Sequence, residues 1–95
     1  MAIAVQLDFA GATAEQYDQV IAKMGFRPEG AGGPGGMFHW VTVTDSGLRV
    51  TDVWETKELF EKFAAEKIGP ISQEVGFPAP PEIQFFGVHN YLTAG

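Results

Sequence analysis

Residues 48–76 change from an alternating to a helical spacing of apolar side chains. Four alternate side chains share one face of an expected strand: Leu48, Val50, Asp52 and Trp54. Beyond them, apolar side chains recur every three or four residues, as in an amphipathic helix: Phe60, Ala64, Ile68, Ile71 and Val75. A strand that passes directly into a helix indicates a compact α+β unit. Because an apolar core needs neither an aspartate nor a tryptophan on that strand face, the pattern also indicates a pocket.

The residues before this segment predict a strand, a helix, a loop and a second strand. Thr13 and Gln16 have the spacing of a capping box, so we expect the helix to begin there, and Gly25 is placed to end it. The other expected elements are a strand at residues 2–9, a glycine-rich loop at residues 26–36, a strand at residues 37–44 and a tight hairpin turn at residues 45–47.

The second helix is expected to break at Gly69 and Pro70. Proline lacks an N–H donor and disfavours helix in the residue before it, so a kink or a short second segment should follow. Residues 77–81 read as an extended linker and residues 82–92 as the last strand. The resulting β-α-β-β-α-β order predicts a single ferredoxin-like α+β domain over residues 1–95. Right-handed crossovers would give it a four-stranded antiparallel sheet in the order 4-1-3-2, with both helices on one face.

All four expected strands carry apolar residues on both faces. In the last strand, for example, Ile83 and Phe85 alternate with Phe86 and Val88. Two helices cover only one face of such a sheet, so the other face needs a second cover. A chain of 95 residues also buries only about 60–65% of its unfolded surface. We therefore predict a homodimer that packs sheet against sheet.

The composition excludes several classes of protein. Nucleic-acid binding needs clustered basic residues, whereas six basic and twelve acidic residues give this chain a net charge of −6, so we expect no nucleic-acid partner. No segment approaches the roughly 20 apolar residues of a membrane span, and the first nine residues lack the basic region of a secretory signal. We expect a cytoplasmic protein that does not bind membranes. The absence of cysteine excludes disulfides and thiolate chemistry.

The element order, the strand-to-helix passage VWETKELFEKF (residues 53–63) and the closing VHNY (residues 88–91) resemble a known superfamily. They are similar to the dimeric α/β barrels, in particular the antibiotic-biosynthesis-monooxygenase-like branch. The resemblance implies a homodimer whose two sheets form a barrel. It also implies a ligand cavity between each sheet and its own helices or inside the barrel. Members include cofactor-independent quinol monooxygenases, haem-degrading enzymes, isomerases, polyketide cyclases and stress-induced proteins, so the fold leaves the function open.

The residues favour a site without haem or metal. The haem-degrading members combine an asparagine on the first strand with a tryptophan and a histidine ten residues apart on the second helix. Here the first strand has no asparagine, and Phe63 and Gln73 stand at the two helix positions. Two histidines and Asp52 could bind iron or zinc, but no close spacing of ligands supports such a site. We therefore expect no cofactor.

The two histidines are the main candidates for chemistry. His39 lies on the second expected strand and His89 on the fourth. The hairpin register brings His39 opposite or diagonal to Trp54 and near Asp52, depending on a bulge at the turn. An aspartate beside a histidine can fix its tautomer and raise its basicity. The two outer strands of a 4-1-3-2 sheet meet those of a partner in a barrel, so His39 of one subunit could approach His89 of the other. Each histidine could also be a satisfied core or rim residue.

The expected ligand is a small apolar or aromatic molecule, held by four aromatic side chains: Phe38, Trp54, Phe85 and Tyr91. Trp54 could instead fill the core, and Tyr91 could instead cap the rim of the barrel. Two functions remain. In the first, the protein is a small enzyme that oxygenates or isomerises an aromatic or polyketide-like molecule without a cofactor. His39 or His89 would then be the base and Asp52 the group that orients it. In the second, it is a non-catalytic binding or stress-response dimer with the same cavity, which needs only shape and apolar surface.

Overall fold

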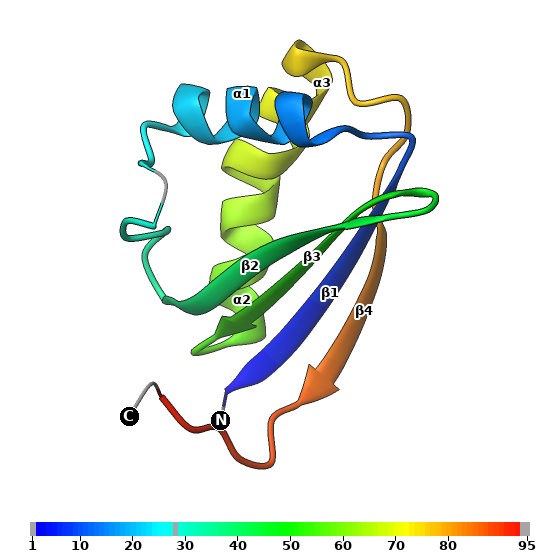
Figure 1. The fold of residues 1–95 in the computed structure, drawn as a ribbon. Coiled ribbons are helices and arrows are strands. Elements are labelled where there is room, and N and C mark those ends of the chain that lie inside the picture. Colours follow the sequence, from blue (N-terminus) through cyan, green and yellow to red (C-terminus); the bar gives the residue numbers. More distant parts are fainter. Residues whose placement is uncertain (1, 28, 94–95) are drawn as a thin grey trace.

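The chain forms four strands and a set of helical segments in the predicted order (Figure 1). The computed structural model describes residues 2–27 and 29–93. Its elements are β1 (Ile3–Ala10), α1 (Ala14–Met24), β2 (Gly36–Thr44), β3 (Gly47–Trp54), α2 (Lys57–Phe63), the π-helical turn η1 (Ala64–Ile68), α3 (Gly69–Val75) and β4 (Glu82–Gly87). None of the helices in these described segments has the length and apolar character needed to cross a membrane.

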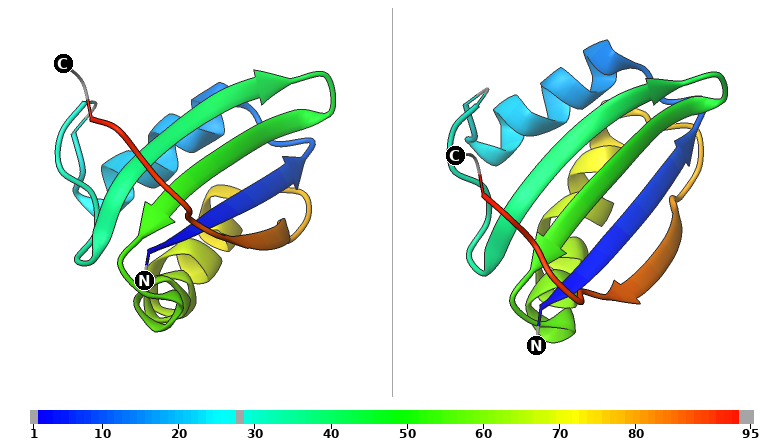
Figure 2. Two further views of the ribbon diagram at one scale, coloured as in Figure 1. Left: turned by 90° about the horizontal axis from the view of Figure 1, so that it is seen from below. Right: turned by 60° about the horizontal axis from the view of Figure 1, so that its bottom comes forward.

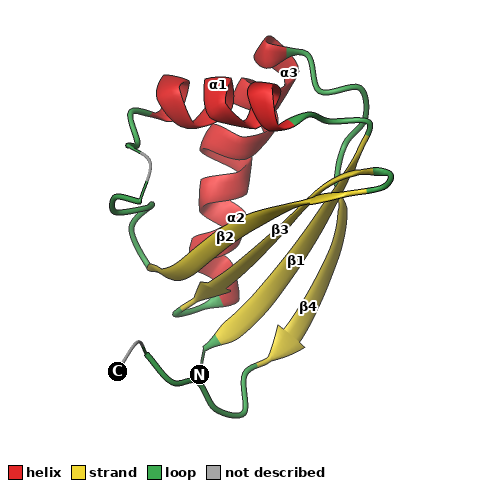
Figure 3. Ribbon diagram, in the orientation of Figure 1, coloured by secondary structure: helices red, strands yellow, loops and turns green. Residues whose placement is uncertain are grey.

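The strands make one antiparallel sheet in the order β2-β3-β1-β4, which confirms the predicted order. The helices α1, α2 and α3 lie on the same face of the sheet, and among the described residues no helix covers the opposite face (Figure 3). Because β3 lies between β2 and β1, the centre of its helix-facing side is shielded from solvent. The sheet order thus places Asp52 in the middle of the molecule.

The hydrophobic core lies between the helices and the helix-facing side of the two central strands. Alternate residues of β1 and β3 point into it: Val5, Leu7, Phe9, Leu48, Val50 and Trp54. Phe60 of α2 packs against them and is among the largest fully buried side chains. Burying a side chain of this size stabilises the fold by roughly 1.5–3 kcal/mol. The core therefore holds α2 against the same strand face that carries Asp52.

The β2–β3 hairpin has a fixed register because its turn packs against β1. Thr44 pairs with Gly47 without a bulge at the turn. The Ser46 carbonyl accepts a hydrogen bond from the Gly11 N–H at 2.7 Å. A Cβ on Gly47 would lie 2.1 Å from the Phe9 carbonyl oxygen, so only glycine fits there. The one irregularity in this pairing lies at the other end, between Gly36 and Phe38.

The predicted break at Gly69 and Pro70 is confirmed, and it has a specific form. The helix begins at Thr56, whose hydroxyl accepts a hydrogen bond from the Leu59 N–H. The Gly69 N–H donates to the carbonyl of Ala64, five residues back, which is a π-helical bond. Pro70 has no N–H with which to continue an α-helical ladder, so the turn before it widens. α3 then follows in a shifted register.

The last strand is shorter than the sequence predicted. β4 ends at Gly87, not at residue 92, and the Val88 N–H donates to the Ala2 carbonyl at 3.1 Å. β1 is the only strand beside β4, and their pairing stops at Ile3 and Gly87, where β1 begins. Residues 88–92 instead cross the helix-free face of the sheet (Figure 2). His89 and Tyr91 are therefore not strand residues.

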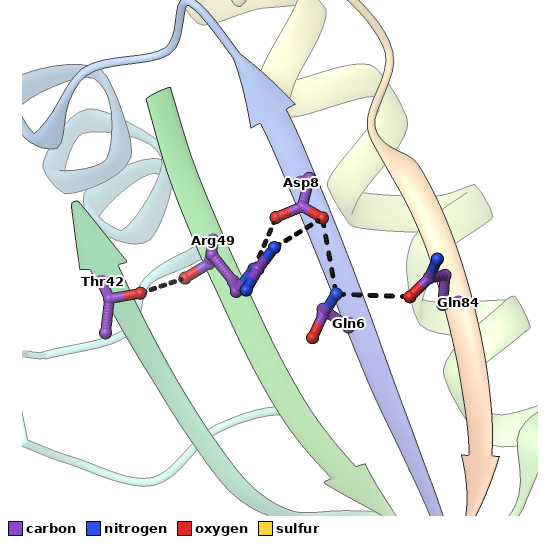
Figure 4. Close-up of polar contacts among 5 residues, drawn as sticks. All are labelled: Gln6, Asp8, Thr42, Arg49 and Gln84. Atoms are coloured by element: carbon purple, nitrogen blue, oxygen red, sulfur yellow. Dashed lines mark hydrogen bonds and ion pairs between the residues drawn. The ribbon is translucent and has the colours of Figure 1, made fainter. Parts of the chain in front are cut away.

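The helix-free face is polar at one end and apolar at the other. At the polar end, the Arg49 guanidinium donates to both carboxylate oxygens of Asp8, at 2.8 and 3.4 Å. Beside this pair, the Gln6 amide donates to Asp8 and to Gln84 (Figure 4). The apolar residues predicted for this face gather at the other end, where residues 88–92 cross: Ala4, Phe38, Trp40 and Val53.

Candidate active site

The site is built around Asp52, a carboxylate on the helix-facing side of β3 that is only 3% exposed. Strand alternation places it between Val50 and Trp54 on that face. One carboxylate oxygen, Oδ2, accepts a hydrogen bond from the Trp54 indole N–H at 3.1 Å. The other, Oδ1, lies 2.5 Å from Nδ1 of His39. A buried carboxylate is costly unless both oxygens are hydrogen-bonded, and here both are.

His39 reaches Asp52 through the strand pairing. The two residues are direct cross-strand partners of β2 and β3. The sequence had left open whether His39 lies opposite or diagonal to Trp54. The unbulged turn places His39 opposite Asp52 and therefore diagonal to Trp54. An ionised carboxylate accepts hydrogen bonds but cannot donate, so Nδ1 of His39 must carry the proton. In the neutral imidazole this tautomer makes Nε2 the hydrogen-bond acceptor.

Tyr17 of α1 completes the chain of side chains. In the sequence it falls on the apolar stripe of this helix, with Ala14, Val20, Ile21 and Met24. Its hydroxyl lies 2.5 Å from Nε2 of His39, and the two rings stack within 10° of parallel. Burial raises the pKa of Tyr17 to about 12, with smaller contributions from the negative charges of Asp52 and Asp18. The phenol is therefore protonated at neutral pH and donates to Nε2. Tyr17 was recognisable as the only side chain with a hydrogen-bonding group in that stripe.

A cavity of about 910 Å³ adjoins this chain of polar groups. It lies between the helix-facing side of the sheet, α1 and the glycine-rich loop. Much of its wall is apolar, with Leu7, Val20, Met24 and Phe63 among the lining residues, and Tyr17, His39 and Asp52 also line it. The loop passes so close to α2 that a Cβ on Gly33 would lie 2.7 Å from the Phe63 ring. A volume of this size suits a small organic ligand with several fused rings.

The structure brings some of the predicted site residues together and separates others. Trp54 lines the large cavity beside His39 and Asp52, whereas Phe38 borders both this cavity and a second hollow, and its ring points to the helix-free face. Phe85 lies outside it, on β4, where it packs edge-to-face on Phe60 under the ammonium group of Lys57.

His89 and Tyr91 are on the opposite side of the sheet from His39. They line a second hollow, of about 520 Å³, formed where residues 88–92 cross the sheet. Tyr91 contacts the Phe38 ring there, with 5.6 Å between centroids. Within one chain, His39 and His89 thus belong to different sites.

The described residues offer no ready metal site. In the segments 2–27 and 29–93, no group of three or more histidine, aspartate or glutamate side chains is placed to hold a metal ion. The chemistry that the cavity can perform with its own side chains is proton transfer. It combines an imidazole with a fixed tautomer, a carboxylate behind it and a phenol in front of it.

Comparison with known proteins identifies the fold. The chain matches no protein-family model. No curated protein matches it either. Among solved structures, SnoaB from Streptomyces nogalater, a cofactor-independent oxygenase, superimposes with a TM-score of 0.62 at 16% identity, over 98% of this chain and 97% of SnoaB. A point mutant of SnoaB gives a TM-score of 0.58 at 17% identity, over 98% and 96% of the two chains.

A second protein shows the same similarity. The monooxygenase from the gene ActVA-Orf6 of Streptomyces coelicolor, in complex with the ligand nanaomycin D, superimposes with a TM-score of 0.56 at 17% identity. The match covers 99% of this chain and 92% of the monooxygenase. The chain therefore shares the ferredoxin-like α+β fold of these oxygenases, the fold that the sequence resemblance implied.

Proposed function

We propose that this protein is a cofactor-independent oxygenase of a phenolic, polyketide-like aromatic molecule. The observation that carries the proposal is the buried Asp52–His39 pair, with its tautomer fixed, on the wall of a largely apolar cavity of about 910 Å³. The similarity in fold to a cofactor-independent oxygenase and to a monooxygenase that holds nanaomycin D supports the same reading. Sequence identity of 16–17% supports a shared fold but not a shared activity. The proposed activity therefore rests on the geometry of the site.

The reaction needs a base because dioxygen oxidises a phenolate far more readily than a neutral phenol. The substrate O–H loses its proton to the imidazole of His39, and the anion then passes one electron to dioxygen. The resulting radical and superoxide join through a new carbon–oxygen bond. The imidazolium of His39 returns its proton to the peroxide that forms. The O–O bond and the C–H bond at the same carbon then break with loss of water, which leaves a quinone with one oxygen atom of dioxygen, while the other leaves as water.

Each side chain of the site has a distinct role in this scheme. His39 accepts the proton, and Asp52 holds the imidazole with Nδ1 protonated and balances the positive charge that forms. Trp54 forms part of the wall against which an aromatic ring would pack. Phe85, His89 and Tyr91 lie outside the large cavity of the chain, so this scheme assigns them no part.

Oxygen uptake with a panel of hydroquinones, anthrones and hydroxynaphthalenes tests the proposal. We expect His39→Ala to lower turnover by roughly 10²- to 10⁴-fold, the usual contribution of a general base, and Asp52→Asn to lower it less. Thr42→Val is a matched control, since it removes a hydroxyl from β2 on the helix-free face. Full turnover in a folded His39→Ala protein would remove His39 from the reaction.

The same experiment separates catalysis from simple binding. A non-catalytic binding protein would hold members of the panel without oxygen uptake by the wild type. In that case the Asp52–His39 pair would be structural, and both variants would act on stability alone. Loss of one partner of a buried polar pair costs about 1–3 kcal/mol, and each kcal/mol lowers the melting temperature of a domain of this size by about 4–8 °C.

We further propose that the protein works as a cytoplasmic homodimer. Large apolar side chains remain exposed on the helix-free face even though residues 88–92 cross it: Trp40, Phe86, Tyr91 and Leu92. A second copy packed against that face would cover them and increase the apolar surface that this small chain buries.

A further inference from the structure

The hydrogen bonds of His39 leave no free nitrogen for a substrate. Nδ1 donates to Asp52 and Nε2 accepts from the Tyr17 hydroxyl, each at 2.5 Å. A substrate hydroxyl can therefore reach the base only by displacing Tyr17 or by passing its proton through Tyr17. The hydrogen bond and the parallel stacking of the Tyr17 and His39 rings hold the hydroxyl in place and favour the second route.

We propose that Tyr17 is the residue that touches the substrate and relays its proton to His39. This inference rests on the proposed function and adds a catalytic residue to it. The phenol oxygen of Tyr17 donates its own proton and keeps lone pairs with which to accept another. Among residues 2–27 and 29–93, that oxygen has no hydrogen-bond partner except His39. Tyr17 also lines the large cavity, so a substrate hydroxyl there can meet it.

The relay moves two protons and conserves charge. The substrate O–H bond breaks and its proton goes to the Tyr17 oxygen, while the Tyr17 proton goes to Nε2 of His39. Afterwards the substrate is an anion that accepts a hydrogen bond from Tyr17, and the imidazolium lies between Tyr17 and Asp52. Tyr17 is a neutral phenol both before and after the transfer. Because no tyrosinate forms in a concerted transfer, the raised pKa of Tyr17 does not oppose it.

The electrostatic environment of Tyr17 agrees with this role. Its pKa of about 12 makes a resting tyrosinate unavailable at neutral pH, so the proton must go on to the imidazole. Two carboxylates, Asp52 and Asp18, act on the hydroxyl, and Arg27 and Glu29 of the loop line the same cavity. The carboxylate of Asp52 lies behind His39, where it stabilises the imidazolium that the relay creates.

Binding of 2-hydroxyanthraquinone tests the relay without any turnover, because its absorption moves to longer wavelength when its phenol ionises. We expect the wild-type protein to lower the pH midpoint of dye ionisation by about one unit or more relative to the free dye, since an imidazolium forms nearby. Tyr17→Phe should abolish this shift and keep the dissociation constant within about threefold, because the ring and its apolar contacts stay. His39→Gln should abolish it too, and Thr42→Val should retain it. Circular dichroism checks that each variant is folded.

Each outcome decides between the relay and its alternatives. A dye shift that survives Tyr17→Phe but not His39→Gln would show that the substrate reaches His39 directly, and the relay would be wrong. A dye that fails to bind, or that binds the wild type without a shift, would overturn the relay as well. A Tyr17-dependent shift in a protein that consumes no oxygen with any phenol would refute the oxygenase proposal and leave the relay standing.

Discussion

At the scale of single residues, Asp52 determines how the site is built. Removing a carboxylate from water costs several kcal/mol, so it persists in the centre of a sheet only with close donors on both oxygens. Trp54 supplies one donor from the same strand, and His39 supplies the other from the neighbouring strand. Trp54 is thus at once a core residue, a wall of the cavity and a hydrogen-bond donor. The sequence analysis had treated core and site as alternatives for this residue.

The raised pKa of Tyr17 predicts a pH dependence of stability. Its folded value of about 12 exceeds the ordinary value of 10.0, so the folded protein holds this proton more tightly than the unfolded chain. The contribution is fully present below pH 10.0 and is lost as the pH rises through about 12. Urea unfolding across this window should show a steeper loss of stability in the wild type than in Tyr17→Phe. If the stability of the two proteins falls equally as the pH rises, the pKa of Tyr17 is not raised in the folded protein.

The sequence predicted the His39–Asp52 contact because the two residues lie on adjacent strands joined by a short turn. Two-residue alternation fixes their face, and the turn fixes their register to within one step. Tyr17 could not be added in the same way. Its position depends on how α1 docks over β2, which follows from packing across the core, since Tyr17 and His39 are 22 residues apart in the chain.

At the scale of elements, glycines at two positive-φ positions offer a matched comparison. Gly47 leaves no room for a side chain because the Phe9 carbonyl would lie 2.1 Å from a Cβ, whereas Gly25 has nothing within 4 Å. We expect Gly25→Ala to cost roughly 1–2 kcal/mol for its left-handed backbone alone. Gly47→Ala should cost roughly 3 kcal/mol or more, since strain and overpacking against the backbone add. Chemical denaturation measures the loss of stability in both variants. Equal losses would show that the close approach of the Phe9 carbonyl is not the reason that position 47 requires glycine.

Elements defined by local pattern were predictable, and elements defined by a neighbour were not. The capping box of Thr13 and Gln16 and the left-handed Gly25 follow from residue types alone, and both are present. The end of β4 depends on where β1 begins, so the apolar alternation that continues past Gly87 was misleading. The sequence predicted the π-helical turn before Pro70 only as a break in the helix. The missing N–H of Pro70 shows that the α-helical hydrogen bonds are interrupted, but not that a π-helical turn replaces them.

At the scale of the whole molecule, the two faces of the sheet serve different purposes. The helix-facing side carries the core, the polar chain from Tyr17 to Asp52 and the large cavity. The other side has a polar end held by the Arg49–Asp8 ion pair and an apolar end only partly covered by residues 88–92 (Figure 4). Exposed aromatic surface beside a polar patch is typical of a surface that meets a partner.

A matched pair of charge substitutions tests the homodimer. Phe86 of β4 is 53% exposed on the helix-free face, whereas Val43 of β2 is 74% exposed on the other face, opposite the buried Leu48. If a second copy covers the helix-free face, Phe86→Lys places an unpaired charge in an apolar contact, and Val43→Lys leaves that contact intact. Sedimentation equilibrium at micromolar concentration should then give twice the chain mass of 10.3 kDa for the wild type and Val43→Lys. Phe86→Lys should sediment as the single chain, with its circular dichroism unchanged. A wild-type monomer would contradict the homodimer and would mean that residues 88–92 cover the apolar end of the sheet sufficiently.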